Sequence, residues 1–343
     1  MALSDVQGQQ HAVEALQASL QRQQVHHAWL FHGPDGVGKE FTAVGLTQAL
    51  LCPEKPWVGC GVCATCKRVL GRNHPDVTWL MPEAEQVQRG IAGRSDFSAT
   101  PSRDIRIEQV RQLQDRLSLR ALEGRHKVAL FVTAHALNLP AQNALLKTLE
   151  EPPRDTVLIL ISSAPDKLLP TIRSRCAKAA FGPLSVDFIA SKVKSEGKKG
   201  IDDALARQIA VMASGSLSRA LSLDPKTLER RKETIEAFEQ LSPDDASGWI
   251  ALAEVFGEDR PTAEAAIDVL QTWFRDVALA QVGATGLVNV DLAPLAQDAG
   301  TRVSPADLQR RALVLDEAKN AITQRNGSVR LQLERMFIEM FTA

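Results

Sequence analysis

The sequence contains no tyrosine, and aromatic residues make up only 5% of its 343 positions. This scarcity leaves no visible platform of rings on which single-stranded nucleic acid could stack. The net charge is also close to zero, at −1 from 40 basic and 41 acidic residues, which argues against a protein that coats nucleic acid. We therefore expect any contact with DNA to come from a local patch or through other subunits.

Long apolar runs are missing as well. No stretch approaches the roughly 20 residues that a membrane span needs. The opening MALSDVQGQQ lacks the cationic start and the apolar stretch of a secretory signal. We therefore expect a cytoplasmic protein with no membrane partner. Its 44% hydrophobic and 24% charged residues are typical of a globular chain, and its length predicts two or three domains.

Cysteine is scarce and unevenly placed, because four of the five cysteines fall within fifteen residues. The spacing C-x7-C-x2-C-x2-C, formed by Cys52, Cys60, Cys63 and Cys66, offers four thiolates to one ion. Four sulfur ligands suit a structural Zn²⁺. An iron–sulfur cluster is the alternative, although its usual C-x2-C-x2-C-x3-C-P run is missing. Cys176 stands alone, and we expect it to be a buried, small apolar residue.

The first 180 residues alternate short apolar runs with amphipathic helical patterns. This alternation predicts an α/β fold with a parallel, doubly wound sheet. The expected strands are 28–31, 77–80, 127–132 and 156–161, and the expected helices are 6–21, 41–51, 107–117 and 140–149. The stretch 83–104 lacks any period and is expected to be a loop.

After about residue 183 nearly every pattern is helical. Phe181-Gly182-Pro183-Leu184 indicates a domain boundary, and Ser242-Pro243-Asp244-Asp245 indicates a second hinge and a helix cap. The domains expected from these breaks are a core over 1–183, a small helical domain over 184–242 and an all-α domain over 243–343.

A glycine-rich loop follows the first expected strand. The residues Gly33-Pro34-Asp35-Gly36-Val37-Gly38-Lys39 match the G-x-x-x-x-G-K part of a P-loop between a strand and a helix. Backbone N–H groups of such a loop bind phosphates, and Lys39 would neutralise them. The next residue should be Ser or Thr, whose hydroxyl ligates Mg²⁺, but here it is Glu40. A glycine turn that no longer binds ATP or ADP is therefore the competing interpretation.

The second half of a P-loop ATPase site is missing. An acidic pair normally follows the strand corresponding to 127–132, where it holds Mg²⁺ and polarises water. Here that strand is followed by Thr133-Ala134-His135-Ala136, with no acid. His135 is a conceivable substitute base, although a lone histidine at a strand end is more often structural. Hydrolysis of ATP by this chain is therefore not expected.

Two arginines follow the fourth expected strand, in the segment Thr171-Ile172-Arg173-Ser174-Arg175-Cys176. The plain interpretation is a solvated helix end. The alternative is an arginine finger, a guanidinium directed at the γ-phosphate of a transferring phosphoryl group. Because this chain lacks a complete site of its own, such a finger would act on a neighbouring subunit.

Together these residues resemble the AAA+ subunits of the bacterial DNA polymerase III clamp loader. The matching stretches cover nearly the whole chain and are densest over 1–221. They are His27–Phe31, the P-loop, the four-cysteine insert, His74–Asp76, Ala141–Pro153, Ser174–Cys176, Gly215–Leu221 and Ser328–Glu334.

The resemblance implies a P-loop core, a three-helix lid and a helical collar that joins five subunits into a ring. It also implies a nucleotide-sensing role for Arg219 in Gly215–Leu221 and a finger role in trans for Arg175. The implied partners are the motor subunits and the delta subunit, with the sliding clamp and primed DNA reached through the complex. The implied function is a non-hydrolysing subunit of the polymerase holoenzyme. The alternatives are an active motor ATPase of the same loader and a zinc-containing DNA-binding protein.

Overall fold

The structure is a computed structural model that describes residues 2–196, 201–223, 225–323 and 327–342. It divides into two compact units. The first comprises Met1–Ile189 with Gly215–Ser218, and the second comprises Ala190–Ser214 with Arg219–Ala343.

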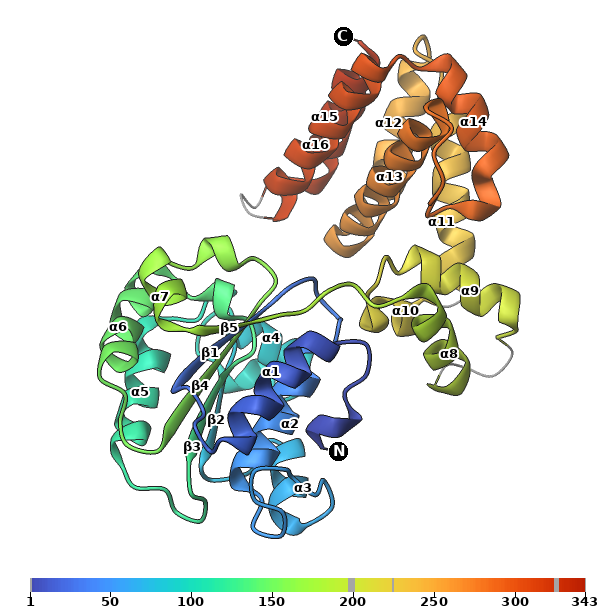
Figure 1. Ribbon diagram of the computed structural model, residues 1–343. Helices are drawn as coiled ribbons and strands as arrows, with labels where there is room; N and C mark the ends of the chain where they lie inside the picture. The colour runs from blue at the N-terminus through green and yellow to red at the C-terminus, as the bar shows by residue number, and fades with distance from the viewer. Residues whose placement is uncertain (1, 197–200, 224, 324–326, 343) are drawn as a thin grey trace. The chain divides into compact units, whose positions relative to one another are not determined.

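A five-stranded parallel sheet forms the centre of the first unit (Figure 1). Its spatial order is β2-β3-β4-β1-β5. The strands are β1 (Ala28–His32), β2 (Val77–Leu80), β3 (Lys127–Phe131), β4 (Thr156–Ser162) and β5 (Ala177–Ala180). The four strands expected from the sequence are confirmed. The edge strand β5 was not predicted, because its sequence AKAA has no β-branched or aromatic residue to mark a strand.

Helices cover both faces of this sheet, with α1 and α2 on one side and α5, α6 and α7 on the other (Figure 1). Leu30 of β1, Phe131 of β3 and Leu160 of β4 pack in one core cluster with Leu113 of α5 and Leu145 of α6. The central strands β3 and β4 are buried along their whole length, as expected of a doubly wound α/β fold. The helices are α1 (Gln10–Gln21), α2 (Lys39–Leu51), α3 (Ala64–Leu70), α5 (Ile107–Ser118), α6 (Leu139–Glu150) and α7 (Pro170–Arg175), with short 3₁₀ turns at Leu3–Asp5, Ala134–Ala136 and Pro165–Lys167.

The stretch 83–104 is not wholly a loop, contrary to the sequence expectation. It contains the helix α4 (Glu83–Gln88) and a 3₁₀ turn at Arg94–Asp96. A helix of six residues is too short to show an apolar period, and all of its residues lie outside the core. Cys176 is 7% exposed within the core cluster, which confirms its expected burial, and this burial raises its pKa to about 12.

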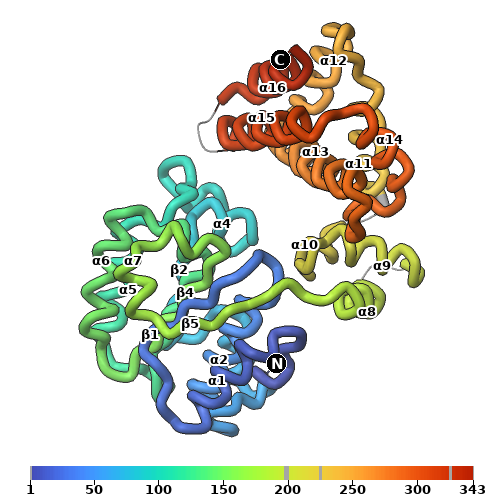
Figure 2. The backbone as a smooth tube through the Cα atoms, turned by 45° about the horizontal axis from the view of Figure 1, so that its top comes forward, coloured from blue at the N-terminus to red at the C-terminus, as the bar shows by residue number. Residues whose placement is uncertain are grey.

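The second unit is helical throughout its described part. Its apolar centre includes Phe238, Trp273 and Phe337, and α15 packs against both α13 and α16 (Figure 2). The helices are α8 (Val186–Glu196, which begins in the first unit), α9 (Asp203–Met212), α10 (Leu217–Ser222, shared with the first unit), α11 (Pro225–Glu239), α12 (Ala246–Phe256), α13 (Arg260–Gln281), α14 (Ala293–Arg302), α15 (Pro305–Thr323) and α16 (Val329–Phe341), with a 3₁₀ turn at Val290–Leu292.

The expected cap near residue 245 is present, because the Asp245 side chain accepts a hydrogen bond from the N–H of Gly248 at 2.9 Å. Among the described residues, none of the helices is long and apolar enough to cross a bilayer.

Candidate functional site: a P-loop beside a four-cysteine centre

The P-loop joins the carboxyl end of β1 to the amino end of α2. Gly36 and Gly38 have φ angles of +73° and +98°, a left-handed conformation that favours glycine. Gln9, which is 5% exposed, donates through Nε2 to the carbonyl oxygen of Val37 at 3.1 Å. The strand–loop–helix arrangement predicted from the sequence is therefore present, with α2 directing its N-terminus at the loop.

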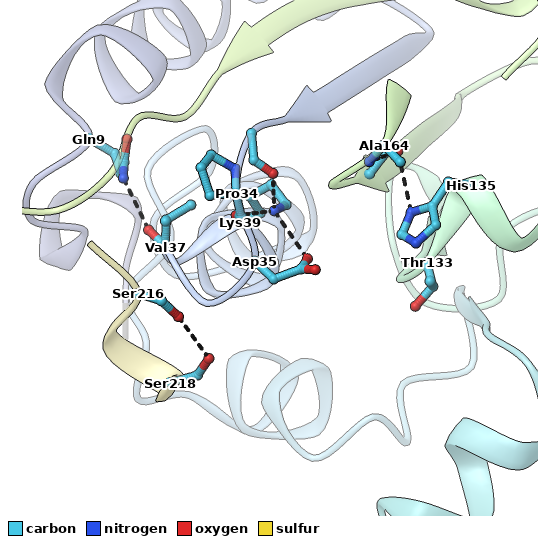
Figure 3. A network of polar contacts seen from close by, with 12 residues as sticks. Gln9, Pro34, Asp35, Val37, Lys39, Thr133, His135, Ala164, Ser216 and Ser218 are labelled. Atoms are coloured by element: carbon cyan, nitrogen blue, oxygen red, sulfur yellow. Dashed lines mark hydrogen bonds and ion pairs between the residues drawn. The ribbon is translucent and has the colours of Figure 1, made fainter. Parts of the chain in front are cut away.

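The ammonium group of Lys39 is held by the loop itself (Figure 3). Its Nζ donates to the carbonyl oxygens of Gly33, at 2.6 Å, and of Pro34, and it lies 3.6 Å from the Asp35 carboxylate. The side chain is only 5% exposed, and this burial lowers the pKa of Lys39 although the Asp35 carboxylate acts in the opposite direction. A phosphate would therefore meet a lysine whose donors are already engaged.

The segment Gly215–Ser218 lies directly against the P-loop and belongs to the same unit (Figure 3). The N–H groups of Leu217 and Ser218 donate to the carbonyl oxygen of Gly36 at 2.9 and 3.3 Å. A Cβ atom on Gly36 would lie 2.0 Å from the hydroxyl oxygen of Ser218 and 2.2 Å from that of Ser216. This close approach was not foreseen from the sequence. Arg219, the expected nucleotide sensor, falls in the second unit.

Glu40 stands where a P-loop normally has its Mg²⁺-binding hydroxyl, and its carboxylate is bound by two arginines. Arg72 donates to Oε1, and Arg89 donates to Oε2 at 2.8 Å. Arg89 also contacts the carboxylate of Glu85 at 2.6 Å. Sequence reasoning missed both arginines and Glu85, because they lie 32 to 49 residues from Glu40 and only the fold brings them together.

The end of β3 carries the residues that the sequence indicated, and no acid follows the strand. The hydroxyl of Thr133 donates instead to the Glu85 carboxylate at 2.5 Å, so a carboxylate from α4 reaches this position. Nδ1 of His135 lies 3.3 Å from the Ser162 hydroxyl. Burial lowers the pKa of His135, and the Asp35 carboxylate only partly offsets this effect. A neutral His135 near Lys39 fits a structural histidine.

The four cysteines of the insert converge as their spacing predicted. All four sulfur atoms lie within 4.8 Å of one another, and the Cys52–Cys63 and Cys60–Cys66 sulfur pairs are each 3.9 Å apart. A tetrahedral Zn²⁺ with bonds of about 2.3 Å requires sulfur atoms about 3.8 Å apart, so the set fits one tetrahedral ion.

Helix ends place these sulfur atoms. Cys52 caps the carboxyl end of α2, and Cys63 caps the amino end of α3, where its sulfur accepts from the N–H of Cys66 at 3.5 Å. The N–H groups of Val62 and Cys63 lower the pKa of Cys60 to about 6, whereas burial raises the pKa of Cys66 to about 12. A divalent cation favours the thiolate form of every ligand.

Arg175 is the last residue of α7, and its guanidinium is partly exposed. It contacts the Glu150 carboxylate at 2.8 Å and donates to the carbonyl oxygen of Thr171 at 3.0 Å. An exposed ion pair of this kind contributes only about 0–1 kcal/mol to stability. The guanidinium can therefore exchange Glu150 for a stronger anion at little cost.

Comparison with known proteins agrees with this geometry. The family profile described as "DNA polymerase III, delta subunit" matches residues 8–185, and the profile described as "DNA polymerase III, delta subunit, C terminal" matches residues 225–340. The delta′ subunit of DNA polymerase III from Pseudomonas aeruginosa is 36% identical over 64% of this chain and 62% of its own length. The delta′ subunit from Escherichia coli is 30% identical over 86% of this chain and 83% of its own length.

The tau subunit of Escherichia coli DNA polymerase III is 32% identical over 66% of this chain and 33% of its own length. The two family profiles together cover the P-loop core and the helical C-terminal part. Of the two Escherichia coli relatives, the tau subunit matches a smaller share of this chain than the delta′ subunit does. With its P-loop core and its helical C-terminal part, the chain belongs to the family of delta′ subunits of DNA polymerase III.

Proposed function

We propose that this chain is a cytoplasmic clamp-loader subunit that does not hydrolyse ATP and that acts as a rigid partner of motor subunits. Within the loader it would help to place the sliding clamp on primed DNA, together with the motor subunits and the delta subunit. The helical part would divide into a lid over 184–242 and a collar over 243–343 that joins the ring. Similarity to a tau subunit supports the shared core architecture.

The observation that carries this proposal is the combination of an incomplete ATP site with an available arginine. Position 40 offers a carboxylate already paired with Arg72 and Arg89, and the residues after β3 supply no acid of their own. Arg175 lies on another element, α7, and is partly exposed. A guanidinium supplied in trans stabilises the charge of a transferring phosphoryl group. We therefore propose that Arg175 serves the ATP site of a neighbouring motor subunit.

Nucleotide binding by this chain remains a separate part of the proposal. Gly33, Gly36, Gly38, Lys39 and Glu40 would form a degenerate site, and the resemblance to clamp-loader subunits assigns a nucleotide-sensing role to Arg219. The engaged Lys39 and the paired Glu40 argue that ATP or ADP binds weakly at most.

We propose that the metal of Cys52, Cys60, Cys63 and Cys66 is a structural Zn²⁺. The supporting observations are an all-sulfur ligand set and sulfur spacings that fit a tetrahedron. With four protein ligands the ion would have no open position for a substrate, so its contribution would be to fix the loop between α2 and α3.

ATP turnover by the purified chain tests the proposed function against an active motor subunit. We expect ATP turnover at background level. We also expect Lys39→Ala to leave that background unchanged, because no side chain of this site is placed to bind Mg²⁺ or to activate the attacking water. Turnover by wild type that Lys39→Ala abolishes would identify the chain as a motor ATPase and overturn the proposal.

A further inference from the structure

The surroundings of Glu40 form a network of opposite charges that connects the two halves of an ordinary P-loop metal site. Arg72 and Arg89 both contact the Glu40 carboxylate, and Arg89 also contacts Glu85. Glu85 in turn accepts from the Thr133 hydroxyl at the end of β3. The network therefore extends from the residue after the P-loop lysine to the position where a hydrolysing site has its acids.

The charges of this network balance internally. Two guanidinium groups face two carboxylates, so neither carboxylate is left to attract a cation. Glu40 is 29% exposed and Glu85 is 18% exposed, so both pairs are partly shielded from water and ions. Mg²⁺ prefers several oxygen ligands in near-ideal octahedral geometry. To bind between the two carboxylates, Mg²⁺ would have to displace Arg89 from Glu40 and Glu85 and compete with Arg72 for Glu40.

Arg72 is held in place by the four-cysteine insert. The helix α3 begins after the Cys63 cap, packs against α2 and ends just before Arg72, which has a left-handed φ of +58°. Gln48 of α2 fixes this packing through a buried 2.8 Å hydrogen bond from its Nε2 to the carbonyl oxygen of Cys66. The guanidinium of Arg72 also lies 4.8 Å from the centre of the Trp79 ring. The position of Arg72 is thus defined before any nucleotide arrives.

We propose that the ion pairs of Glu40 with Arg72 and Arg89 are an internal lock that excludes Mg²⁺, and with it the Mg²⁺ complex of a nucleotide, from this P-loop. The lock rests on the proposed non-hydrolysing function and explains it in terms of two arginines. Arg72 and Arg89 are positioning residues in this account, since they act through Glu40.

The test measures binding of fluorescently labelled ADP to the full chain in excess Mg²⁺ and in EDTA. Wild type is expected to show the same affinity, however weak, in both conditions. Glu40→Thr supplies the missing hydroxyl, and Mg²⁺ should then tighten binding by about tenfold or more relative to EDTA. Glu40→Ala frees both arginines and offers no side-chain metal ligand, so it should bind labelled ADP more tightly than wild type and equally in both conditions.

A second arm uses no nucleotide, and a matched control accompanies both. Arg89→Ala leaves Glu40 and Glu85 without their shared cation, and it should bind one Mn²⁺ by electron paramagnetic resonance where wild type binds none. Glu123→Gln removes an ion-paired carboxylate elsewhere in the same unit, opposite Arg68, and should behave as wild type in both assays.

Wild-type binding that Mg²⁺ tightens tenfold would overturn the lock while leaving a non-hydrolysing subunit possible. The lock would also be overturned if a folded Glu40→Thr variant bound labelled ADP equally with and without Mg²⁺, or if Arg89→Ala gained no Mn²⁺ site. ATP hydrolysis by wild type would overturn the lock and the proposed function together, so the two failures are distinguishable.

Discussion

Replacing Gly36 with alanine is expected to release the segment Gly215–Ser218 from the P-loop. The new Cβ would lie 2.0 Å from the Ser218 hydroxyl oxygen, 2.2 Å from that of Ser216 and 3.0 Å from the Cβ of Ser218. Rotation of the two hydroxyl groups therefore relieves only part of the crowding, and we expect the segment to shift. That movement would break the hydrogen bonds from the N–H groups of Leu217 and Ser218 to the Gly36 carbonyl oxygen.

The magnitude follows from two separate costs. A left-handed φ of +73° strains an alanine by about 1 kcal/mol. Loss of the two hydrogen bonds adds about 0.5–1.5 kcal/mol each. Gly38 provides a matched control, because it has a φ of +98° but no atom within 4 Å of its missing Cβ. Gly38→Ala should therefore be destabilised by the backbone strain alone. The difference of about 1–3 kcal/mol between the two variants is the free energy of displacing the segment from the P-loop.

Hydrogen exchange followed by mass spectrometry is the assay, on peptides that contain Leu217 and Ser218. A difference of 1–3 kcal/mol corresponds to exchange roughly 5- to 150-fold faster in Gly36→Ala than in Gly38→Ala. Adding Ser216→Ala and Ser218→Ala to Gly36→Ala should restore part of the protection, since both clashing oxygens are then gone. Equal exchange in the two glycine variants would refute the close contact between this segment and the P-loop.

Two further predictions concern the metal centre and a buried carboxylate. Elemental analysis should find one zinc per wild-type chain and none in Cys63→Ser. The far-UV circular dichroism spectrum of the variant should be unchanged, because the sheet does not depend on the insert. Iron in place of zinc would contradict the assignment. Asp76, 7% exposed, accepts hydrogen bonds from the N–H groups of Leu122, Glu123 and Gly124, so Asp76→Asn should lower the free energy of unfolding at pH 7 by about 1–3 kcal/mol in urea titrations. Burial disfavours the ionised form of Asp76, but the three N–H donors outweigh this effect and lower the pKa of Asp76. The stabilisation by the ionised carboxylate is therefore complete above about pH 4 and is lost as the pH falls through the lowered pKa. The difference in unfolding free energy between wild type and Asp76→Asn should shrink in acid. A difference that does not depend on pH would contradict the assigned role of the carboxylate.

Much of the fold could be predicted from the sequence because its signals are local. Four apolar runs gave four of the strands, and the glycine spacing placed the P-loop between a strand and a helix. The cysteine spacing likewise identified four residues whose sulfur atoms converge. The strand β5 and the helix α4 could not be predicted, because both are short. In addition, β5 lacks β-branched residues and α4 shows no apolar period.

The charge network could not be predicted, because its members are brought together only by tertiary structure. Glu40 was recognised as a departure from the P-loop pattern, but nothing in its neighbourhood in the sequence indicates Arg72 or Arg89. Long, flexible arginine side chains can pair with many carboxylates, so pairing is decided by where α3 and α4 end. The contact of Gly36 with Ser218 is equally non-local, since 182 residues separate them.

The central claim, that this chain supplies a catalytic arginine to a neighbour, is tested most directly by ATP turnover of the reconstituted loader. Arg175→Ala should assemble normally and retain its metal, yet lower turnover, because a guanidinium in trans is worth on the order of 10³ or more at the site it serves. The loss in the whole complex is smaller, since other sites keep their own fingers. Arg175→Lys should rescue poorly, because an ammonium lacks the planar fork that grips two phosphate oxygens.

Arg173→Ala is the matched control for this measurement, because Arg173 lies on the same helix and contacts Asp166 at 2.7 Å. It should leave turnover at the wild-type level. A drop confined to Arg175→Ala is the result that the account predicts. Equal turnover and equal clamp loading by the wild-type and Arg175→Ala complexes would contradict it, and would leave Arg175 as the surface ion pair with Glu150 alone.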